Sequence, residues 1–269
     1  MGIEYRGVTK TFAGTAAVEN FSMTLPSRST TVFVGSSGCG KTTLLRMVNR
    51  MVEPSGGQIL IDGVDVSTRK AVELRRSIGY VMQHSGLLPH RKVVDNVAIP
   101  LRLSGIPRAE ARRRAHEALE KVGLESGLAK RYPLQLSGGQ QQRVGVARGL
   151  VTDPNILLMD EPFGAVDPIV RAELQQELLR LQRELGKTIL FVTHDIDEAF
   201  LLGDQVVILQ KGAHIAQVGT PAEILAAPAD DFVSRFIGAD TAKRVLRVEQ
   251  IDGRQVVVDA DGRPAGVLA

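Results

Sequence analysis

The sequence predicts an α/β fold in which helices cover both faces of a mainly parallel sheet. The first reason is a set of short, almost wholly apolar runs at residues 31–34, 156–159 and 188–192, as expected of strands buried on both faces. The second is that amphipathic segments alternate with these runs, and the longest of them begins near Pro168 and stops at Gly186. The third is a glycine-rich segment placed directly between the first strand and a helix.

This glycine-rich segment, residues 35–43, fits the phosphate-binding pattern G-x-x-x-x-G-K-[ST] in full. Glycines let the backbone curl with its N–H groups pointing inward, and the following helix adds its positive N-terminal end. Lys41 can reach the β- and γ-phosphates of a nucleotide, and the Thr42 hydroxyl can ligate Mg²⁺. The segment therefore predicts ATP and Mg²⁺ as cofactors. The residues expected to bind them are Gly35, Ser36, Ser37, Gly38, Cys39, Gly40, Lys41, Thr42 and Thr43.

Composition narrows the class of protein. The 269 residues include 33 basic and 30 acidic side chains, and this net charge of +3 is too balanced to indicate nucleic acid binding. Cys39 is the one cysteine, which suits a reducing compartment, and we interpret it as a small residue in a tight loop rather than a redox switch. No apolar run approaches the ~20 residues of a membrane span, and the N-terminus lacks a secretion signal. These features predict a cytosolic chain unless a partner holds it at a membrane.

Other segments suggest how the chain is organised around this loop. Residues 3–25 alternate in short apolar and polar runs and predict an antiparallel sheet, with Phe12 in the connecting loop. Residues from about 84 to 150 predict a separate helical lobe. Arginines 112–114 lie on one of its helices, where they could touch lipid headgroups or a partner, although a solvated face is the preferred interpretation.

Two carboxylates follow the apolar run at 156–159. Asp160 ends the predicted strand, and such strand ends face the ligand crevice in α/β folds, so it can hold Mg²⁺ opposite Thr42. Glu161 points to the other side of the extended backbone and is expected to orient or deprotonate the water that attacks the γ-phosphate. The alternative is a solvated Asp–Glu pair, which the complete phosphate loop upstream disfavours.

Two further polar residues end predicted strands. His194 follows the run at 188–192 and can contact the γ-phosphate while it holds the attacking water and Glu161 in register. A purely structural histidine is the alternative, and the strand-end position favours function. Gln83 offers an oxygen to Mg²⁺ and lies at the junction with the helical lobe, so it could report the nucleotide state to that lobe.

A second anion site is predicted where Ser137, Gly138 and Gly139 open a helix. One phosphate loop already serves one ATP, so a second cradle makes sense only if it faces the ATP bound to another copy of the chain. This predicts a head-to-tail pair of domains with nucleotide between them. Asp167 could contact the other subunit or cap a helix, and both roles can hold together.

Over residues 3–238, the chain resembles the ATP-binding subunit of an ABC importer. The resemblance is carried by motifs that follow one another in the family's order: the phosphate loop, Gln83, the segment 136–140, the two carboxylates and His194. The resemblance implies a P-loop NTPase with a RecA-like core, an antiparallel β-subdomain and an α-helical subdomain. It further implies ATP hydrolysis with Glu161 as the catalytic base and His194 as the switch histidine. Phe12 would stack on adenine with Val18 also among the nucleotide contacts, and the ATP of the opposing subunit would contact Ser137, Gly138, Gly139 and Gln140.

Within this family, residues 73–83, 86–90, 160–168 and 229–233 are similar to the branch that imports glycine betaine, choline, carnitine or proline. Amino-acid importers share much of this pattern, so an importer of amino acids or another small solute is the alternative. The resemblance implies transmembrane permease subunits as partners, a solute-binding protein as an indirect one, and a peripheral position on the cytoplasmic face of the membrane. A non-transport ABC ATPase of DNA repair or translation is less favoured, because the chain has one cassette and no long heptad run.

Two features depart from the family pattern. Residues 256–268 resemble the closing hairpin of a CBS regulatory motif, but the tail at 239–269 is too short for a complete pair of such domains. Gly145 and Gly149 lie inside the helix that follows Ser137, where alanine is commoner. Each glycine costs up to ~1 kcal/mol relative to alanine, so we expect a softer helix there.

Overall fold

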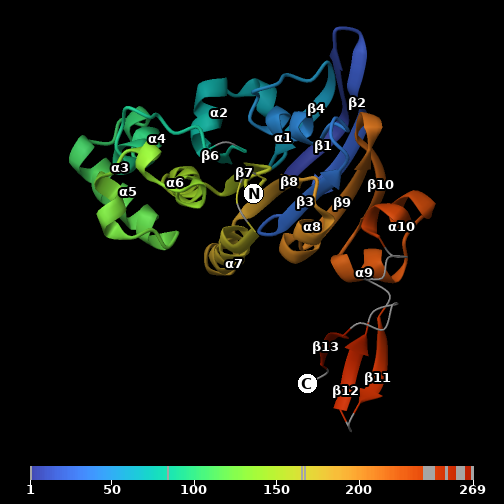
Figure 1. Cartoon of the computed structure of the whole chain (residues 1–269). Helices are drawn as coiled ribbons and strands as arrows, with labels where there is room; N and C mark the ends of the chain where they lie inside the picture. Colours follow the sequence, from blue (N-terminus) through green and yellow to red (C-terminus); the bar gives the residue numbers. More distant parts are fainter. Residues whose placement is uncertain are drawn as a thin grey trace.

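The computed structural model describes residues 2–83, 85–164, 166, 168–238, 246–251, 254–258 and 264–267 of the chain. Its central sheet is built from β3 (Thr30–Gly35), β6 (Ile78–Val81), β7 (Ile156–Asp160), β8 (Thr188–Thr193), β9 (Gln205–Gln210) and β10 (His214–Gly219). The strand order is β10-β9-β3-β8-β7-β6, and every neighbouring pair is parallel except β9 and β10 (Figure 1). The predicted α/β fold with a mainly parallel sheet is confirmed.

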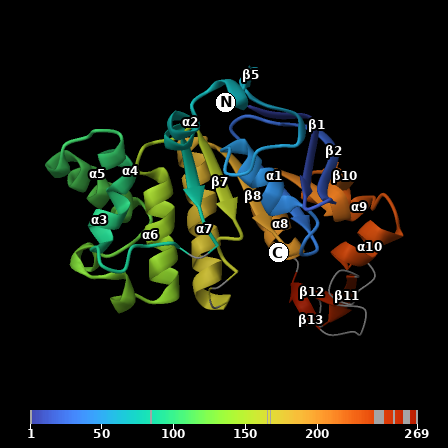
Figure 2. The same cartoon turned by 90° about the horizontal axis from the view of Figure 1, so that it is seen from above.

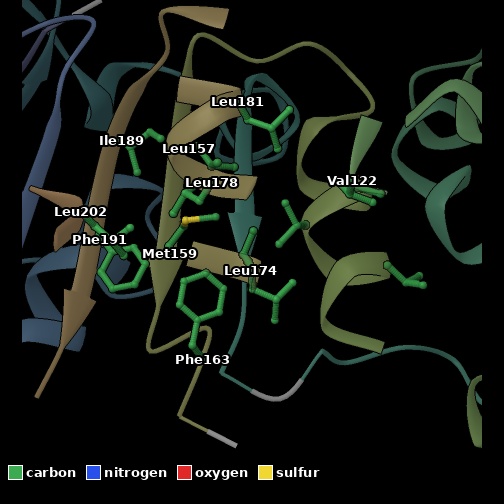
Figure 3. Packing of buried hydrophobic residues seen from close by; sticks show 14 of the residues in the cluster. Val122, Leu157, Met159, Phe163, Leu174, Leu178, Leu181, Ile189, Phe191 and Leu202 are labelled. Atoms are coloured by element: carbon green, nitrogen blue, oxygen red, sulfur yellow. The ribbon is translucent and has the colours of Figure 1, made fainter. Parts of the chain in front are cut away.

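Helices cover both faces of this sheet, so alternate residues of a strand enter different cores. Every residue of β3, β7 and β8 is buried, as their apolar runs predict. On one face, Leu157 and Met159 of β7 and Phe191 of β8 pack against Leu174 and Leu178 of α7 (Pro168–Leu185), as Figure 3 shows. The other face packs against α1 (Lys41–Val48) and a second sheet. The strands of the central sheet are therefore packed on both faces, and this packing positions the residues at their ends.

The second sheet is antiparallel, as predicted for residues 3–25. It contains β1 (Ile3–Phe12), β2 (Thr15–Leu25), β4 (Gly56–Ile61) and β5 (Val64–Asp65) in the order β2-β1-β4-β5. The turn between β1 and β2 is only two residues long, because Ala13 and Gly14 both adopt positive φ, at 45° and 83°. Phe12 therefore ends β1, paired with Thr15, and the expectation that it lies in a loop was wrong.

The helix α1 is shorter than the predicted span of about 41–52. Arg50 adopts the left-handed conformation, with φ of 58°, immediately after the C-cap residue Asn49, and such a residue ends a helix. An aromatic cluster joins the second sheet to the central sheet. The ring centroid of Phe21 lies 5.1 Å from that of Tyr5 and 5.8 Å from that of Phe33 in β3. This packing fixes β1 and β2 beside the phosphate loop.

The predicted helical lobe lies beyond β6 at the edge of the sheet (Figures 1 and 2). As predicted, α5 begins after Pro107 and ends before Gly123, whose φ is 67°. In both views α6 lies between the rest of the lobe and the sheet. The segments of the lobe are α3 (Val93–Val97), α4 (Ile99–Leu103), α5 (Arg108–Lys121) and α6 (Gly138–Leu150), with short 3₁₀ turns at Ser126–Lys130 and Pro133–Gln135. Before β6, the chain forms a 3₁₀ turn at Val66–Thr68 and the helix α2 (Ala71–Ser77).

The chain after β8 closes the domain and continues into a small sheet. The closing segments are α8 (Ile196–Leu202), a 3₁₀ turn at Lys211–Ala213, α9 (Pro221–Ala226) and α10 (Asp231–Ile237). The small sheet consists of β11 (Arg247–Ile251), β12 (Arg254–Val258) and β13 (Pro264–Val267), and β12 pairs antiparallel with β13 as the predicted hairpin requires. Its likeness to part of a CBS motif stays a prediction. Among the described residues, the structure contains no helix whose length and apolarity would allow it to span a bilayer.

Candidate nucleotide-binding site

The phosphate loop runs from Gly35 at the end of β3 to Lys41 at the start of α1. Glycine is needed at several of its positions for different reasons. Gly38 and Gly40 have φ of 78° and 113°, and a Cβ atom on Gly40 would lie 2.6 Å from the carbonyl oxygen of Ala17. A Cβ atom on Gly35 would lie 2.3 Å from the carbonyl oxygen of Leu209. The loop is therefore pressed against β2 and β9, which leave no room for a side chain at Gly35 or Gly40.

Polar groups of this loop fit a polyphosphate. Lys41 is 4% exposed, and its Nζ donates to the carbonyl oxygens of Gly35 at 2.7 Å and Ser36 at 2.9 Å, so the ammonium is held inside the curl. The N–H groups of Gly38, Gly40 and Lys41 have no acceptor within the described part of the chain. Unpaired donors around a fixed cation are what phosphate oxygens need.

Other loop residues frame this cradle. Ser36 and Ser37 are exposed, and Thr43 is half-buried in the first turn of α1. The side chain of Cys39 is buried, as expected of a small residue in a tight loop.

Asp160 is the best-held carboxylate beside the loop. The Thr42 hydroxyl donates to its Oδ1 at 2.8 Å, while Arg46 and the Tyr80 hydroxyl donate to its Oδ2, each at 3.1 Å. Burial, together with the Asp160 charge, raises the pKa of Tyr80 to about 12, so its phenol keeps the proton that it donates. The structure thus brings Thr42 and Asp160 together, and their oxygens suit Mg²⁺.

Arg46 and Tyr80 were not predicted from the sequence. Arg46 lies one helical turn after Thr42, and that i, i+4 spacing could have suggested a shared face. Tyr80 carries no such signal, because it reaches Asp160 only through the pairing of β6 with β7.

Gln83, Glu161 and His194 meet at the carboxyl-terminal edge of the sheet. Glu161 Oε2 accepts from Gln83 Nε2 at 3.3 Å and lies 3.1 Å from His194 Nδ1. This distance suits a hydrogen bond in the tautomer of His194 that carries a proton on Nδ1. The backbone of Glu161 has φ of 45°, and its N–H donates to the carbonyl oxygen of Val192 at 2.9 Å, which turns the carboxylate out of the strand. The two side chains thus occupy one oxygen of Glu161.

Next to these residues, a hydrogen bond and an ion pair join α7 to α8. Gln175 Nε2 donates to the buried Glu198 Oε1 at 3.0 Å. One turn earlier on α7, Arg171 donates to the carbonyl oxygen of Val166 and pairs with Asp195 at 3.7 Å. Asp195 follows His194 directly in the chain, so these ties connect the segment after Glu161 with the segment after His194.

The residues predicted to form a second anion site open α6. Ser137 and Gly138 are exposed, and Ser137 and Gln140 form a capping box, in which the Ser137 hydroxyl accepts from the Gln140 N–H and Gln140 Oε1 accepts from the Ser137 N–H. Gly139 is buried, and a Cβ atom there would lie 2.1 Å from Val170 Cγ1 of α7. In both views α6 and α1 lie on opposite sides of β7 (Figures 1 and 2). This arrangement supports a cradle that serves another copy.

Three further residues, Phe12, Val18 and Asp167, were predicted to belong to the site. Phe12 is 47% exposed, and Lys10 Nζ lies 4.9 Å from the centre of its ring. Val18 is fully buried, and its methyl group lines the space beside Gly40, so in this structure it supports the loop from beneath. Asp167 lies outside the described residues. Their contacts with a nucleotide stay predictions.

The comparison with protein families decides the identity of this site. Residues 18–164, more than half of the chain, match the family described as ABC transporter. The chain belongs to the ABC transporter family. Members of this family bind ATP, generally with Mg²⁺, which agrees with the donors of the phosphate loop and the Thr42–Asp160 pair.

Curated members of the family resemble the chain over most of its length. The choline transport ATP-binding protein OpuBA of Bacillus subtilis is 48% identical over 94% of this chain and 68% of its own length. The osmoprotectant import ATP-binding protein OsmV of Salmonella typhimurium is 46% identical over 94% of this chain and 66% of its own. The glycine betaine uptake system ATP-binding protein YehX of Escherichia coli is 44% identical over 98% of this chain and 89% of its own. The chain thus spans about two thirds of the length of the first two relatives.

Solved structures of ABC cassettes share the fold. A dimeric, post-hydrolysis structure of the ATP-binding cassette MJ0796 bound to ADP and phosphate is 33% identical and superimposes with a TM-score of 0.74 over 81% of this chain and 98% of that one. CbiO1 of Clostridium perfringens, part of the transporter complex cbiONQ, is 32% identical with a TM-score of 0.76 over 84% of this chain and 91% of that one. The expected core with its antiparallel and helical subdomains is therefore that of an ABC ATPase.

Proposed function

We propose that the chain is the ATP-hydrolysing subunit of an ABC importer for quaternary-amine osmoprotectants such as glycine betaine, choline, carnitine or proline. The observation that carries the hydrolytic part is the grouping of Gln83, Glu161 and His194 beside the Thr42–Asp160 pair. The solute class is supported by the names of relatives 44–48% identical to the chain. Solute recognition itself would belong to membrane and solute-binding partners.

The residues divide the work of hydrolysis between them. Lys41 and the unpaired N–H groups of the loop bind and orient the phosphates, and Thr42 with Asp160 would hold Mg²⁺, which supplies charge neutralisation at the γ-phosphate. Gln83 and His194 occupy Glu161 Oε2, which leaves Oε1 to accept a proton from water. The exposed opening of α6 at Ser137 then completes the phosphate site of a second copy. Each copy therefore contributes half of its partner's site.

A groove in the helical region is proposed to receive the permease. Its volume is about 380 Å³, and exposed apolar residues, among them Val72 of α2 and Leu103 of α4, lie along it. Arg148 of α6 also lines it and donates to the carbonyl oxygens of Ser85 and Gly86, just after Gln83. A segment seated in the groove would contact a side chain that holds the Gln83 loop. The chain would thus lie peripherally on the cytoplasmic face of the membrane.

The hydrolytic assignment is tested by Glu161→Gln, which keeps the shape of the side chain but removes the base. We expect the rate of ATP hydrolysis to fall by about 10²–10⁴-fold while ATP still binds. Glu19→Gln is the matched control, because Glu19 also pairs with a histidine, His214, at 3.3 Å but outside the site. A Glu161→Gln protein that hydrolysed ATP at the native rate would exclude Glu161 as the base.

The solute class is tested separately, with the chain reconstituted together with its permease and solute-binding partners. Uptake of labelled glycine betaine should be competed by choline or carnitine and not by amino acids other than proline. Competition by amino acids alone would assign the amino-acid alternative and leave the hydrolytic assignment untouched.

A further inference from the structure

A basic cavity lies at the outer end of the helical lobe, away from the phosphate loop. Its volume is about 430 Å³, and it opens between the loop before α3, the helix α4 and the first turns of α5. In both views these helices lie on the far side of α6 from α1 (Figures 1 and 2). Its charged lining residues are Arg91, Lys92, Asp95, Arg102, Arg108 and Arg112. None of them takes part in the proposed hydrolysis.

The charge of this cavity is exceptional for the chain. It gathers five of the 33 basic residues and one of the 30 acidic residues, so the rest of the chain carries 28 basic against 29 acidic residues. Within the described residues, the ion pair of Arg112 with Asp95, at 3.2 Å, is the one pairing of these cations with a carboxylate. The other four cations therefore face the cavity without a counter-charge from the protein. Such a concentration of like charge attracts an anion.

The walls that present these cations are held in place. Asn96 is fully buried, and its Oδ1 accepts from the N–H of Leu88 at 2.7 Å. Its Nδ2 lies 3.1 Å from the carbonyl oxygen of Arg91 and 3.2 Å from that of Lys92, so one amide pins the loop that carries both cations. Arg102 Nη1 donates to the carbonyl oxygen of Ile106 at 2.7 Å. The site is thus organised before any ligand arrives.

The start of α5 adds to the same positive field. Arg108 is its first residue, no side chain caps that end of the helix, and the helix is 14 residues long. Unpaired N–H groups at a helix N-terminus carry partial positive charge. Arg112 lies one turn further on the same face, so two guanidinium groups and the helix end point toward one region.

The consecutive arginines 112–114 make different contacts. Arg112 lines the cavity, whereas Arg113 pairs with Glu110 and Glu117 on the solvated face of α5. Arg114 donates to the carbonyl oxygen of Val151. Of the three, only Arg112 lines this cavity, and the preferred solvated interpretation holds for Arg113.

We propose that this cavity binds a phosphate-bearing anion with two or more negative charges. Guanidinium groups match phosphate oxygens in pairs, and several of them around one cavity favour a multiply charged phosphate over a carboxylate. A volume of about 430 Å³ accommodates a phosphorylated small molecule as well as the headgroup of an acidic phospholipid. The two sources share the same chemistry and are separated by experiment.

Binding is measured on the full chain with Mg²⁺ and excess ADP, so that the phosphate loop is filled. Titration calorimetry with inorganic pyrophosphate tests a phosphate in solution. Flotation with vesicles of phosphatidylcholine alone, or mixed equally with phosphatidylglycerol, tests a headgroup. The cavity variant is Arg102→Gln with Arg108→Gln, and Arg91→Gln with Arg108→Gln is a second one in case the first fails to fold.

Arg6→Gln with Arg113→Gln is the matched control, because it removes the same charge from two exposed arginines that already pair with Glu4 and Glu110. We expect the affinity for at least one probe to fall about tenfold or more in the cavity variants, and less than about twofold in the control. If the cavity variants lose only pyrophosphate binding, the ligand is a phosphorylated compound in solution. If they lose only flotation with the acidic vesicles, the ligand is the lipid headgroup. Absence of binding of either probe by the native chain, or an equal loss in the control, would overturn the proposal.

Discussion

The two parts of the chain proposed to meet ATP differ in how their polar groups are satisfied. At the end of β7, Asp160 is buried and accepts three hydrogen bonds from residues distant in the sequence. At the start of α1, Lys41 is buried and donates to two carbonyl oxygens of the phosphate loop that follows β3. At the start of α6, Ser137 is exposed, and its capping box with Gln140 is entirely local. The first part is built by the sheet, whereas the second is a helix terminus presented to solvent.

This difference indicates which half can act alone. A parallel sheet brings the carboxyl ends of several strands to one edge, so residues distant in sequence are pre-organised there. A helix terminus supplies N–H groups and a dipole but no enclosing walls. We therefore expect the loop half to bind nucleotide in a single chain and the α6 half to matter only when two chains close together.

The largest effect expected from this comparison is on paired hydrolysis. Ser137→Ala should lower the steady-state ATPase rate by about tenfold or more while a single chain binds ATP as before, because the missing hydroxyl serves the partner's nucleotide. Loss of the cap also costs about 1 kcal/mol of stability. Thr220→Ala is the control, since Thr220 forms the same capping box with Glu223 on α9, far from this site. Equal loss of ATP affinity in a lone Ser137→Ala chain would break the distinction.

A smaller effect is expected from Tyr80→Phe in the sheet-borne half. The change removes one of the three donors to Asp160 and should raise the KM for Mg²⁺-ATP by about threefold to tenfold, because a hydrogen bond to a charged group is lost. Tyr132, which is exposed on the helical lobe, gives the control Tyr132→Phe. An unchanged KM would mean that Thr42 and Arg46 hold Asp160 without help.

Two glycines test the softness of α6 itself. A Cβ atom on Gly145 would meet its nearest neighbour, Ser85 Cβ, at 3.6 Å, an ordinary contact, so Gly145→Ala should raise the free energy of unfolding by up to about 1 kcal/mol. A Cβ atom on Gly149 would lie 3.1 Å from Val81 Cγ2, so Gly149→Ala should give less stability or none. Urea unfolding of both variants measures the difference. The reverse order would contradict the packing of α6 on β6.

The smallest effect concerns the tie between α7 and α8 behind Glu161 and His194. Burial raises the pKa of Glu198 above its ordinary 4.5, so the folded state holds the proton more tightly than the unfolded chain does. The associated stability is present below the ordinary pKa and is lost as the pH rises through the raised one. Glu198→Gln keeps an oxygen for Gln175 and should be slightly more stable than the native chain at about pH 7 but equal to it at about pH 4. A uniform change at both pH values would assign a packing effect instead.

Most of the candidate site could be predicted from the sequence because its residues end apolar runs. Asp160, Glu161 and His194 follow such runs directly, and the phosphate loop stands between a strand and a helix. Arg46 and Tyr80 could not be ranked in the same way, since their partner is more than 75 residues away. Asp160 becomes a neighbour of Tyr80 through the pairing of β6 with β7, and of Arg46 through the packing of α1 against β7. Phe12 was misplaced because the turn after it has only two residues, both with positive φ. One of them is Ala13, and alanine is not a residue from which a positive φ would be predicted.

The sequence by itself determined the strand–helix order, the phosphate loop and the identity of the carboxylates, because these depend on local periodicity and fixed spacing. Only the tertiary structure decided that Gln83 and His194 share one oxygen of Glu161, that Gly139 lies against α7, and that cations from the loop before α3, from α4 and from α5 surround one cavity. Those relations arise from strand pairing and helix packing between distant segments, and the distances that they set are not encoded in any local pattern of residues.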